Sequence, residues 1–465
     1  MQLAPTLREH QAIIDEHSMS VPGFAPVLVR EIDLSGPLPT LCAVHAQKPQ
    51  VYGSVRCLVR LHTQPVGLID FTFGSRHELS PEEYAPLIWQ ALAKHINNHL
   101  CSDGLAEATA LEAGGLPDLH VPKCIEAREA FLQRAPLASV VISTRDRPDR
   151  LARCLPPLLA MRYPNFEIIV VDNAPSTSAT ADFIQQTYAT EPMVRYVRED
   201  RPGLSAGRNR GIQEARGEII AITDDDVTVD TYWLAGLAQG FEAAENVACV
   251  TSLLLPLELE TPAQVWLEEF GGFNKGFVRR VFDLKHGKED TPLHPFTAGR
   301  FGTGGGLALT AQYLRQEGGF DPALGNGTRS GGGEDLAAFF QVIARGYRLV
   351  YEPGSLVYHE HHRDYAKLKK QMYYYGSSLT AYLTKIVIDN PSLLLSIIAR
   401  IPHGFKLIFS SKSEKNRKKS GQFPQELTRL ERKGMLRGPS FYIKGRRANK
   451  RSSFSRPGAP AARKT

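Results

Sequence analysis

Residues 137–144 read LASVVIST, and this buried-strand pattern opens the alternation that decides the fold. Comparable apolar runs follow as NFEIIVVD at 165–172, MVRYVRE at 193–199 and GEIIAIT at 217–223. Helix-like segments lie between them, from about Asp149 onward, at 176–190 and at 203–215. Short apolar strands that alternate with helices favour an α/β fold, with a parallel sheet covered on both faces.

Polar clusters stand at the ends of three of these strands. They read STRDRPDR at 143–150, VDNAPS at 171–176 and TDDDVT at 223–228. In a parallel sheet these ends meet at one edge, and α/β proteins bind their ligands at that edge. We therefore expect the functional site there.

The third cluster places Asp224, Asp225 and Asp226 side by side, and three like charges need a positive partner. Carboxylates two residues apart suit Mg²⁺ or Mn²⁺, which keep positions for water and phosphate oxygens. Such a cation can neutralise a pyrophosphate leaving group. The alternative is an acidic turn that caps the helix expected at 231–243.

Residues upstream of this cluster could complete a nucleotide site. Asp172 could accept hydrogen bonds from a base or a ribose. Arg201, Arg208 and Arg210 lie in DRPGLSAGRNRG, where small residues allow close approach and the start of a helix could face an anion. The alternative for these arginines is a solvated helix face.

Glycine-rich stretches follow downstream. Gly304–Gly306 begins an apolar strand, which suits close approach by a substrate. A loop at Gly325–Gly333 then leads into a helix with Glu334 and Asp335 in its first turn. These carboxylates either interact with the helix dipole or include a general base that deprotonates an acceptor hydroxyl.

YHEHH at 358–362 places His359, His361 and His362 after a further strand. One of them could complete a metal shell. A single histidine is more often an ordinary surface or core residue, so the pattern alone leaves both interpretations open.

The chain ends differ from this core. Residues 1–130 carry strand patterning and one capped helix from Pro81, which predicts a small accessory α+β domain. Residues 386–465 contain an amphipathic segment at 392–409, too interrupted for a membrane span, and a strongly basic end. The segment is either an interfacial or a domain-packing helix, and the basic end is either a solvated tail or a contact for anionic lipids.

Charge and cysteine usage limit the partners and the compartment. No nucleic-acid-binding motif accompanies the basic residues, so we expect no nucleic-acid partner. The six cysteines include no C-x-x-C pair, which argues against a disulfide framework and against a thiolate zinc site. The N-terminus lacks a signal-peptide plan. We expect a cytoplasmic protein with peripheral contact at the inner face of the cell membrane.

In their order, the motifs S-x-x-I-x-T-R-D-R, IIVVDN, GLSAGRNRG, ITDDD, GGGED and YHEHH resemble the family 2 glycosyltransferases. The resemblance covers about residues 137–385. It implies a GT-A fold, which is a Rossmann-like nucleotide-diphospho-sugar transferase core, and an inverting transfer with Mn²⁺ or Mg²⁺. The accessory domain and the helical, basic C-terminal extension lie outside it.

The resemblance also implies residue roles. Thr144, Arg145 and Asp146 match the nucleotide-contacting loop, and Asp172 matches the acid that contacts the base. Asp224 and Asp226 match the outer positions of the metal and sugar-diphosphate motif. The remaining expected positions are Asp225 and Arg208 at the donor, Asp226 as the direct metal ligand, His359 as an added ligand, Asp335 as catalytic base, and Gly305, Gly306 and Glu334 near the acceptor.

The expected activity is a hexosyl or deoxyhexosyl transfer to a hydroxyl of a saccharide or glycolipid, in bacterial surface polysaccharide or glycolipid biosynthesis. Two alternatives stay open. One is a non-catalytic nucleotide-sugar-binding protein. The other is a phosphatase, because DDDVT also fits a D-x-D-x-T nucleophile loop, although three strand–helix units precede it.

Overall fold

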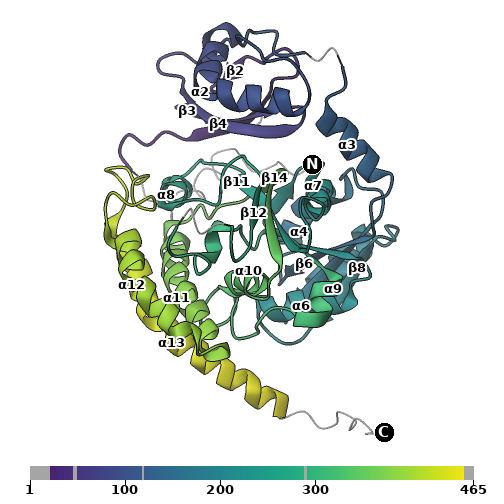
Figure 1. Cartoon of the computed structure of the whole chain (residues 1–465), viewed down its shortest axis with the longest axis vertical. Helices are drawn as coiled ribbons and strands as arrows, with labels where there is room; N and C mark the ends of the chain where they lie inside the picture. The colour runs from purple at the N-terminus through teal and green to yellow at the C-terminus, as the bar shows by residue number, and fades with distance from the viewer. Residues whose placement is uncertain (1–20, 45–49, 118–119, 287–290, 455–465) are drawn as a thin grey trace, which may run out of the picture.

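The computed structural model describes residues 21–44, 50–117, 120–286 and 291–454. A small N-terminal unit lies above a larger α/β body, and the C-terminal helices run along one side of that body (Figure 1). The predicted fold class is confirmed by this arrangement, with a parallel-rich sheet at its centre.

The N-terminal unit is an α+β structure built on a three-stranded sheet in the order β1-β3-β4. Its helix α2 begins as predicted, with Pro81 in its first turn and the Ser80 backbone N–H donating to the Glu83 carboxylate at 2.9 Å. The elements of this unit are β1 (Val27–Asp33), β2 (Leu41–Cys42), β3 (Ser54–Leu61), β4 (Gln64–Thr72), β5 (Glu78–Leu79) and α2 (Pro81–Ser102). Helix α3 (Lys123–Leu132) then leads into the α/β body.

A nine-stranded sheet forms the centre of the body, in the order β10-β14-β11-β13-β9-β6-β7-β8, with β12 paired to β14. The four strands predicted from the alternation are all present and mutually parallel where they pair. These strands are β6 (Ala138–Thr144), β7 (Phe166–Asn173), β8 (Val194–Glu199) and β9 (Ile219–Thr223). The helices between them are α4 (Pro148–Leu159), α5 (Ala179–Thr187) and α6 (Leu204–Glu214).

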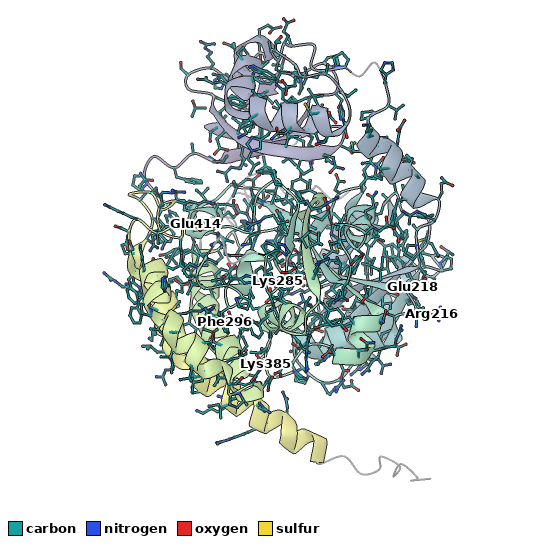
Figure 2. The ribbon with its side chains drawn as sticks, viewed as in Figure 1. Arg216, Glu218, Lys285, Phe296, Lys385 and Glu414 are labelled. Carbon is teal, nitrogen blue, oxygen red and sulfur yellow. The ribbon has the colours of Figure 1, made fainter. Side chains whose placement is uncertain are left out.

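Alternate residues of β6 show how the sheet is covered on both faces. Val140 and Ile142 join a core cluster with residues of α4 and α7, whereas Val141 joins the cluster that includes α10 and α11. Both clusters are buried, which explains why β6 reads as a continuous apolar run. Phe296, labelled in Figure 2, belongs to the second cluster and stacks on Phe340 of α10.

The second half of the sheet departs from the simple parallel pattern. Strand β13 enters beside β9 and is antiparallel to both β9 and β11. The elements of this half are β10 (Val227–Val229), α7 (Trp233–Gly240), β11 (Val247–Pro256), α8 (Pro262–Phe270), β12 (Arg280–Phe282), a 3-10 turn η1 (Ala298–Arg300), β13 (Gly306–Thr310), α9 (Ala311–Glu317), α10 (Glu334–Ala344) and β14 (Arg348–His359).

Three helices complete the described chain: α11 (Tyr365–Asp389), α12 (Leu393–Phe409) and α13 (Gln425–Phe454). Helix α13 packs along α11 and reaches the body, where the buried Tyr442 donates its hydroxyl hydrogen bond to Asp321 at 2.9 Å. Much of the basic C-terminal region is therefore an ordered helix against the body. Within the described residues, none of the helices has the length and apolarity that a membrane span requires.

Candidate active site at the carboxyl edge of the sheet

Each of the three consecutive aspartates after β9 has its own arginine. Asp224 Oδ1 accepts a hydrogen bond from Arg208 Nη2 at 2.9 Å. Asp225 accepts one from Arg147 Nη1 at 3.3 Å and one from the Thr144 hydroxyl at 2.7 Å. The third carboxylate, Asp226, accepts from Arg150 Nη1 at 2.6 Å. Guanidinium groups therefore offset the repulsion within the cluster.

The cluster divides into carboxylates of different acidity. Burial raises the pKa of Asp224 to about 6, against the opposing effect of Arg208. Burial also raises the pKa of Asp225, and the charge of Asp226 adds to the shift. Burial opposes ionisation of Asp226 too, but neighbouring His359 and Arg150 hold its pKa below the usual value. Asp226 is thus the carboxylate most strongly kept in its charged form.

Arg208 lies at the centre of the site and is 1% exposed. Besides Asp224, it donates to the Gly304 carbonyl at 2.9 Å and to the Glu334 carboxylate at 3.0 Å. The Gly304 N–H in turn donates to Asp335 Oδ2 at 3.0 Å. A Cβ on Gly304 would lie only 3.2 Å from Asp335 and 3.3 Å from Arg208, so glycine permits this junction.

Glu334 and Asp335 open α10 but face different surroundings. Glu334 is buried, and its Oε2 has no hydrogen-bond partner. Burial, together with the charge of Asp335, raises the pKa of Glu334 to about 7. Asp335 is only partly buried and both of its oxygens accept backbone N–H bonds, from Gly304 and Leu336. Glu334 therefore holds Arg208, while Asp335 lies beside the glycine triplet.

The loops after β6 and β7 are joined by Asp146. Its backbone has a φ of +53°, and its carboxylate accepts hydrogen bonds from the Ser176 N–H at 2.9 Å and hydroxyl at 2.8 Å. Arg145, next to it, has a side chain that is 56% exposed. The loop therefore holds Asp146 in place, and Arg145 lies 3.7 Å from it with most of its side chain in solvent.

Asp172 is the penultimate residue of β7 and is fully buried. Tyr196 donates its hydroxyl hydrogen bond to Oδ2 at 3.1 Å, whereas Oδ1 is buried without a partner. Burial raises the pKa of Asp172. A buried acceptor without a donor is costly unless a ligand supplies one.

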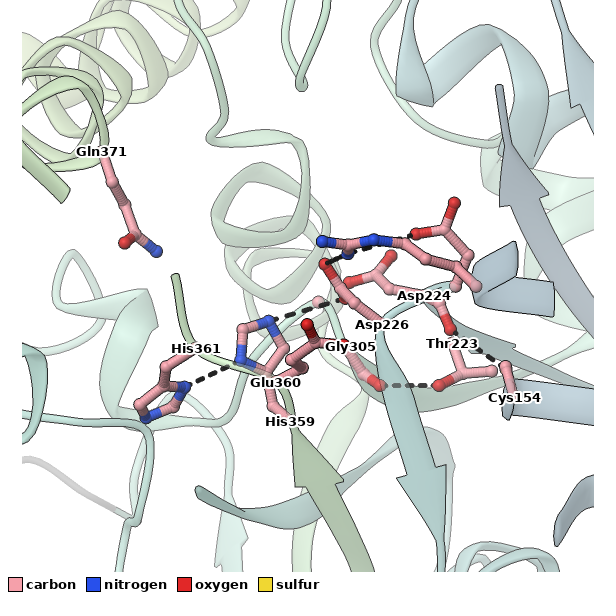
Figure 3. A network of polar contacts seen from close by, with 12 residues as sticks. Cys154, Thr223, Asp224, Asp226, Gly305, His359, Glu360, His361 and Gln371 are labelled. Carbon is pink, nitrogen blue, oxygen red and sulfur yellow. Dashed lines mark hydrogen bonds and ion pairs between the residues drawn. The ribbon is translucent and has the colours of Figure 1, made fainter. Parts of the chain in front are cut away.

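His359 is brought to Asp226 by the pairing of β10 with β14, in which Val227 lies opposite His359. The His359 Nε2 atom lies 3.6 Å from Asp226 Oδ1. His359 in turn contacts His361 at 2.9 Å (Figure 3). The other ring nitrogen of His361 lies 3.0 Å from Glu268 Oε1. His361 therefore orients His359 rather than facing the aspartates.

These positions fit a divalent cation between Asp226 and His359. Their facing atoms are too far apart for a hydrogen bond, and a carboxylate with an imidazole is a donor set that Mn²⁺ accepts. Burial lowers the pKa of His359 to about 4, so its imidazole is neutral at neutral pH and has a lone pair to share. The second oxygen of Asp224, Oδ2, lies beside Gly305, 3.4 Å from the position that a Cβ there would take.

The loop Gly325–Gly333 closes over the start of α6. The Leu204 N–H donates to the Asn326 carbonyl at 2.9 Å, and the Ser377 hydroxyl of α11 donates to the Ser330 carbonyl at 2.8 Å. Gly333 has a φ of +92° at the N-cap of α10, a conformation that glycine adopts without strain. The loop is thus positioned between the arginine-bearing helix and the C-terminal helices.

Sequence reasoning placed Thr144, Arg208, Asp224, Asp226 and His359 in one site, and the structure brings these five together. It missed Arg147 and Arg150, which pair with Asp225 and Asp226 from the first turn of α4. Both arginines follow β6 directly, and this position at the end of a strand could have indicated that they belong to the site. Asp225 was predicted to contact the donor sugar, but its side chain is turned to Thr144 and Arg147.

Comparisons with known proteins agree with the motifs. Residues 139–290 match the sequence model of glycosyl transferase family 2. A pre-mycofactocin glycosyltransferase of Mycobacterium tuberculosis is 24% identical over 274 residues, which are 57% of this chain and 53% of the relative. An uncharacterized protein of Sinorhizobium fredii is 37% identical over 126 residues, 26% of this chain and 14% of the relative. The chain thus spans about half or less of these relatives.

Among solved structures, a mannosyltransferase of Pyrobaculum calidifontis, in complex with GDP-Man and Mn²⁺, is 17% identical and has a TM-score of 0.39. The similarity covers 73% of this chain and 86% of that one. The support for the predicted family resemblance comes from the sequence model and not from this structural similarity. Residues 139–290 match that model, as the motifs predict.

Proposed function

We propose that the chain is an inverting, metal-dependent glycosyltransferase. It moves a hexosyl or deoxyhexosyl group from a nucleoside-diphospho-sugar to a hydroxyl acceptor. The observation that carries this proposal is the connection from Asp224 through Arg208 and Gly304 to Asp335. Asp224 lies at the sheet edge where the nucleoside diphosphate would bind, and Asp335 is the carboxylate that would act on the acceptor.

The donor would lie along the carboxyl ends of β6, β7 and β9. Asp172 offers its unpartnered Oδ1 to an N–H of the base or to a ribose hydroxyl. Arg147 and Arg150 lie at the N-terminus of α4, where their cationic side chains attract a diphosphate. The exposed Arg145 adds a further donor to the same edge.

Asp226, Asp224 and His359 would hold the divalent cation, Mn²⁺ or Mg²⁺. When bound, such an ion neutralises negative charge on a leaving diphosphate. Arg208 keeps Asp224 aligned while leaving its second oxygen free of that bond.

Asp335 would accept the proton of the acceptor hydroxyl as its oxygen attacks the anomeric carbon. The bond from that carbon to the diphosphate oxygen breaks on the opposite face, and configuration inverts. The N–H groups of Gly304 and Leu336 fix the carboxylate for this role. Water competes as an acceptor, so the loop Gly325–Gly333 is the proposed lid over the site.

The test is Asp335→Asn, which keeps the size and one acceptor oxygen but removes the base. We expect binding of the nucleotide sugar to persist and transfer to fall by about 10²-fold or more. Asp182→Asn, an exposed carboxylate on α5, is the matched control. Full transfer activity in Asp335→Asn would contradict the base assignment, and loss of donor binding would point to a structural role.

The two alternatives make different predictions. In a D-x-D-x-T phosphatase Asp224 would attack phosphorus, but its Oδ1 is engaged by Arg208 and its pKa is raised to about 6. A non-catalytic binding protein would bind donor without turnover. Thermal-shift screening of nucleotide sugars with Mn²⁺, followed by product analysis, separates the three, since a bound ligand raises apparent stability.

We further propose that the acceptor is a saccharide or glycolipid of bacterial surface assembly and that α12 touches the inner face of the membrane. No residue of α12 is buried. Six of its large apolar side chains are 44–77% exposed: Leu394, Leu395, Ile398, Ile401, Phe405 and Phe409. Five of them follow the spacing of one helix face. Exposed basic residues follow directly at Lys412, Arg417 and Lys418, which suits anionic lipid.

The membrane contact is tested with the full-length protein and vesicles. We expect co-sedimentation with phosphatidylglycerol-containing vesicles and little with phosphatidylcholine alone. Leu395→Glu and Phe405→Glu should release the protein, whereas Val278→Glu, which changes a 62% exposed valine on the body, should not. Equal binding of all variants would contradict the proposal.

A further inference from the structure

Four metal-ligating side chains converge in the N-terminal unit, outside the aspartate cluster of the sheet. His62 Nδ1 lies 2.6 Å from Asp103 Oδ2, and His99 Nε2 lies 3.2 Å from the same oxygen. The two imidazole nitrogens are 3.1 Å apart. The Cys124 sulfur is 3.0 Å from Asp103 Oδ2, and all four ligand atoms lie within 4.8 Å of one another.

Three separate segments supply these side chains. His99 and Asp103 are four residues apart at the end of α2, so they share one face of the helix. His62 stands in the two-residue turn between β3 and β4 with a φ of +52°, where asparagine or glycine is usual. Cys124 lies in the first turn of α3. The cluster therefore joins the hairpin, the long helix and the helix that leads into the body.

A further hydrogen bond orients the Asp103 carboxylate, as hydrogen bonds around a metal site orient the ligands. The Cys124 backbone N–H donates to Asp103 Oδ1 at 3.0 Å, which turns Oδ2 toward the two histidines. His62 and Asp103 have side chains that are 0% and 4% exposed. Such a second hydrogen bond on a ligating carboxylate sets its orientation and is typical of built metal sites.

We propose that His62, His99, Asp103 and Cys124 bind a divalent cation of borderline softness, with Zn²⁺ the ion that fits best. Two imidazoles, one carboxylate and one thiolate form a complete four-ligand set, which is the arrangement of a closed structural site. Tetrahedral bonds of about 2.0–2.3 Å place ligand atoms about 3.3–3.7 Å apart. The contacts given above are shorter, at 2.6–3.2 Å, so the side chains move slightly apart when the ion binds. The oxygen-rich set around Asp226 suits harder ions.

The site gives α3 a fixed position on the N-terminal unit. Four residues after Cys124, Arg128 donates to the Thr63 hydroxyl at 2.6 Å. Its guanidinium also stacks over the ring of Tyr232, 3.6 Å from the centroid, just before α7 of the body. An ion that ties α3 to the turn at His62 therefore also holds the contact between the accessory unit and the body.

The test uses the full chain, purified with reducing agent and without chelator. We expect about one zinc per chain by elemental analysis. After removal of the metal by a strong chelator, the unfolding temperature should fall by several degrees and Zn²⁺ should restore it. Added Co²⁺ should give the near-ultraviolet absorption of a cobalt–thiolate bond, which reports a cysteine ligand directly.

Variants assign the ligands. Cys124→Ser should lose the cobalt–thiolate band, and His99→Gln should lose the zinc. Cys101→Ser changes an exposed cysteine on α2 and should keep both the band and the zinc. Asp226→Asn should also keep them, which separates this site from the one proposed for the transferase. Wild-type protein that holds no zinc and gives no cobalt–thiolate band overturns the proposal, even if a ligand variant fails to fold. Zinc lost in Asp226→Asn but kept in Cys124→Ser overturns it as well.

Discussion

Arg208 Nη2 lies 2.9 Å from Asp224 Oδ1. This pair lies at the border between the parallel half of the sheet and the half that contains the antiparallel β13. Arg208 comes from α6, which lies between the predicted parallel strands β8 and β9. Asp224 follows β9, the strand at the border with the antiparallel β13. The same guanidinium reaches Glu334 on α10, so one buried side chain links three segments.

We predict that Arg208→Met lowers the free energy of unfolding by about 3–5 kcal/mol, because it leaves the buried Glu334 and the partly buried Asp224 without their cation. Urea unfolding of the full chain measures the effect. Arg210→Met is the control, since Arg210 is 40% exposed and pairs with Glu214 on the surface. It should cost under about 0.5 kcal/mol. The double variant Arg208→Met/Glu334→Gln should recover part of the loss, and a double variant no more stable than Arg208→Met would contradict the pairing.

Glu334 predicts a pH dependence of stability. Its pKa rises from 4.5 to about 7 in the folded state, mainly through burial, so the folded state binds more protons between these values. Glu334 thus contributes stability that is full below about pH 4.5 and is lost as the pH rises to about 7. Glu334→Gln removes this dependence.

Urea unfolding of both proteins at pH 5 and pH 8 measures the difference. The stability of wild type relative to Glu334→Gln should be greater at pH 5 than at pH 8, by about 3 kcal/mol at most. A difference that does not change with pH would show that Glu334 titrates normally in the folded protein.

Local patterns were sufficient to predict the first half of the body. Strands β6, β7 and β9 read as apolar runs because both faces of the sheet are covered, and their ends meet because they are parallel. The capped start of α2 also followed from adjacent residues. Where the interactions that form an element lie within a few residues of one another, the local sequence is sufficient to predict that element.

Long-range pairing was not predictable in this way. Nothing near Gly306–Thr310 indicates that β13 inserts antiparallel between β9 and β11. The contact of Arg150 with Asp226, 76 residues away, depends on the pairing of β6 with β9. The cluster around Asp103 was missed for the same reason, because its four ligands come from segments that share no spacing motif.

His359 provides a test that depends on the proposed function. Its imidazole is neutral at neutral pH, because burial lowers its pKa to about 4, and it lies beside Asp226. We expect His359→Gln to raise the Mn²⁺ concentration needed for half-maximal transfer by at least about 10-fold. His361→Gln should shift it in the same direction, because His361 contacts the other ring nitrogen. His403→Gln, on the exposed α12, is the control, and an unchanged metal requirement in His359→Gln would remove it from the metal site.

The close approach of α11 and α13 requires glycines where the two helices cross. A Cβ on Gly434 would lie 2.0 Å from the Tyr373 carbonyl oxygen, so alanine there must push the two helices apart. We expect Gly434→Ala to lower the free energy of unfolding by about 1–3 kcal/mol and to speed hydrogen exchange along α13. Gly404 of α12 has no atom within 4 Å of its Cβ position, so Gly404→Ala should be neutral or stabilise by up to about 1 kcal/mol. Equal effects of the two substitutions would mean that α13 does not pack against α11 in solution.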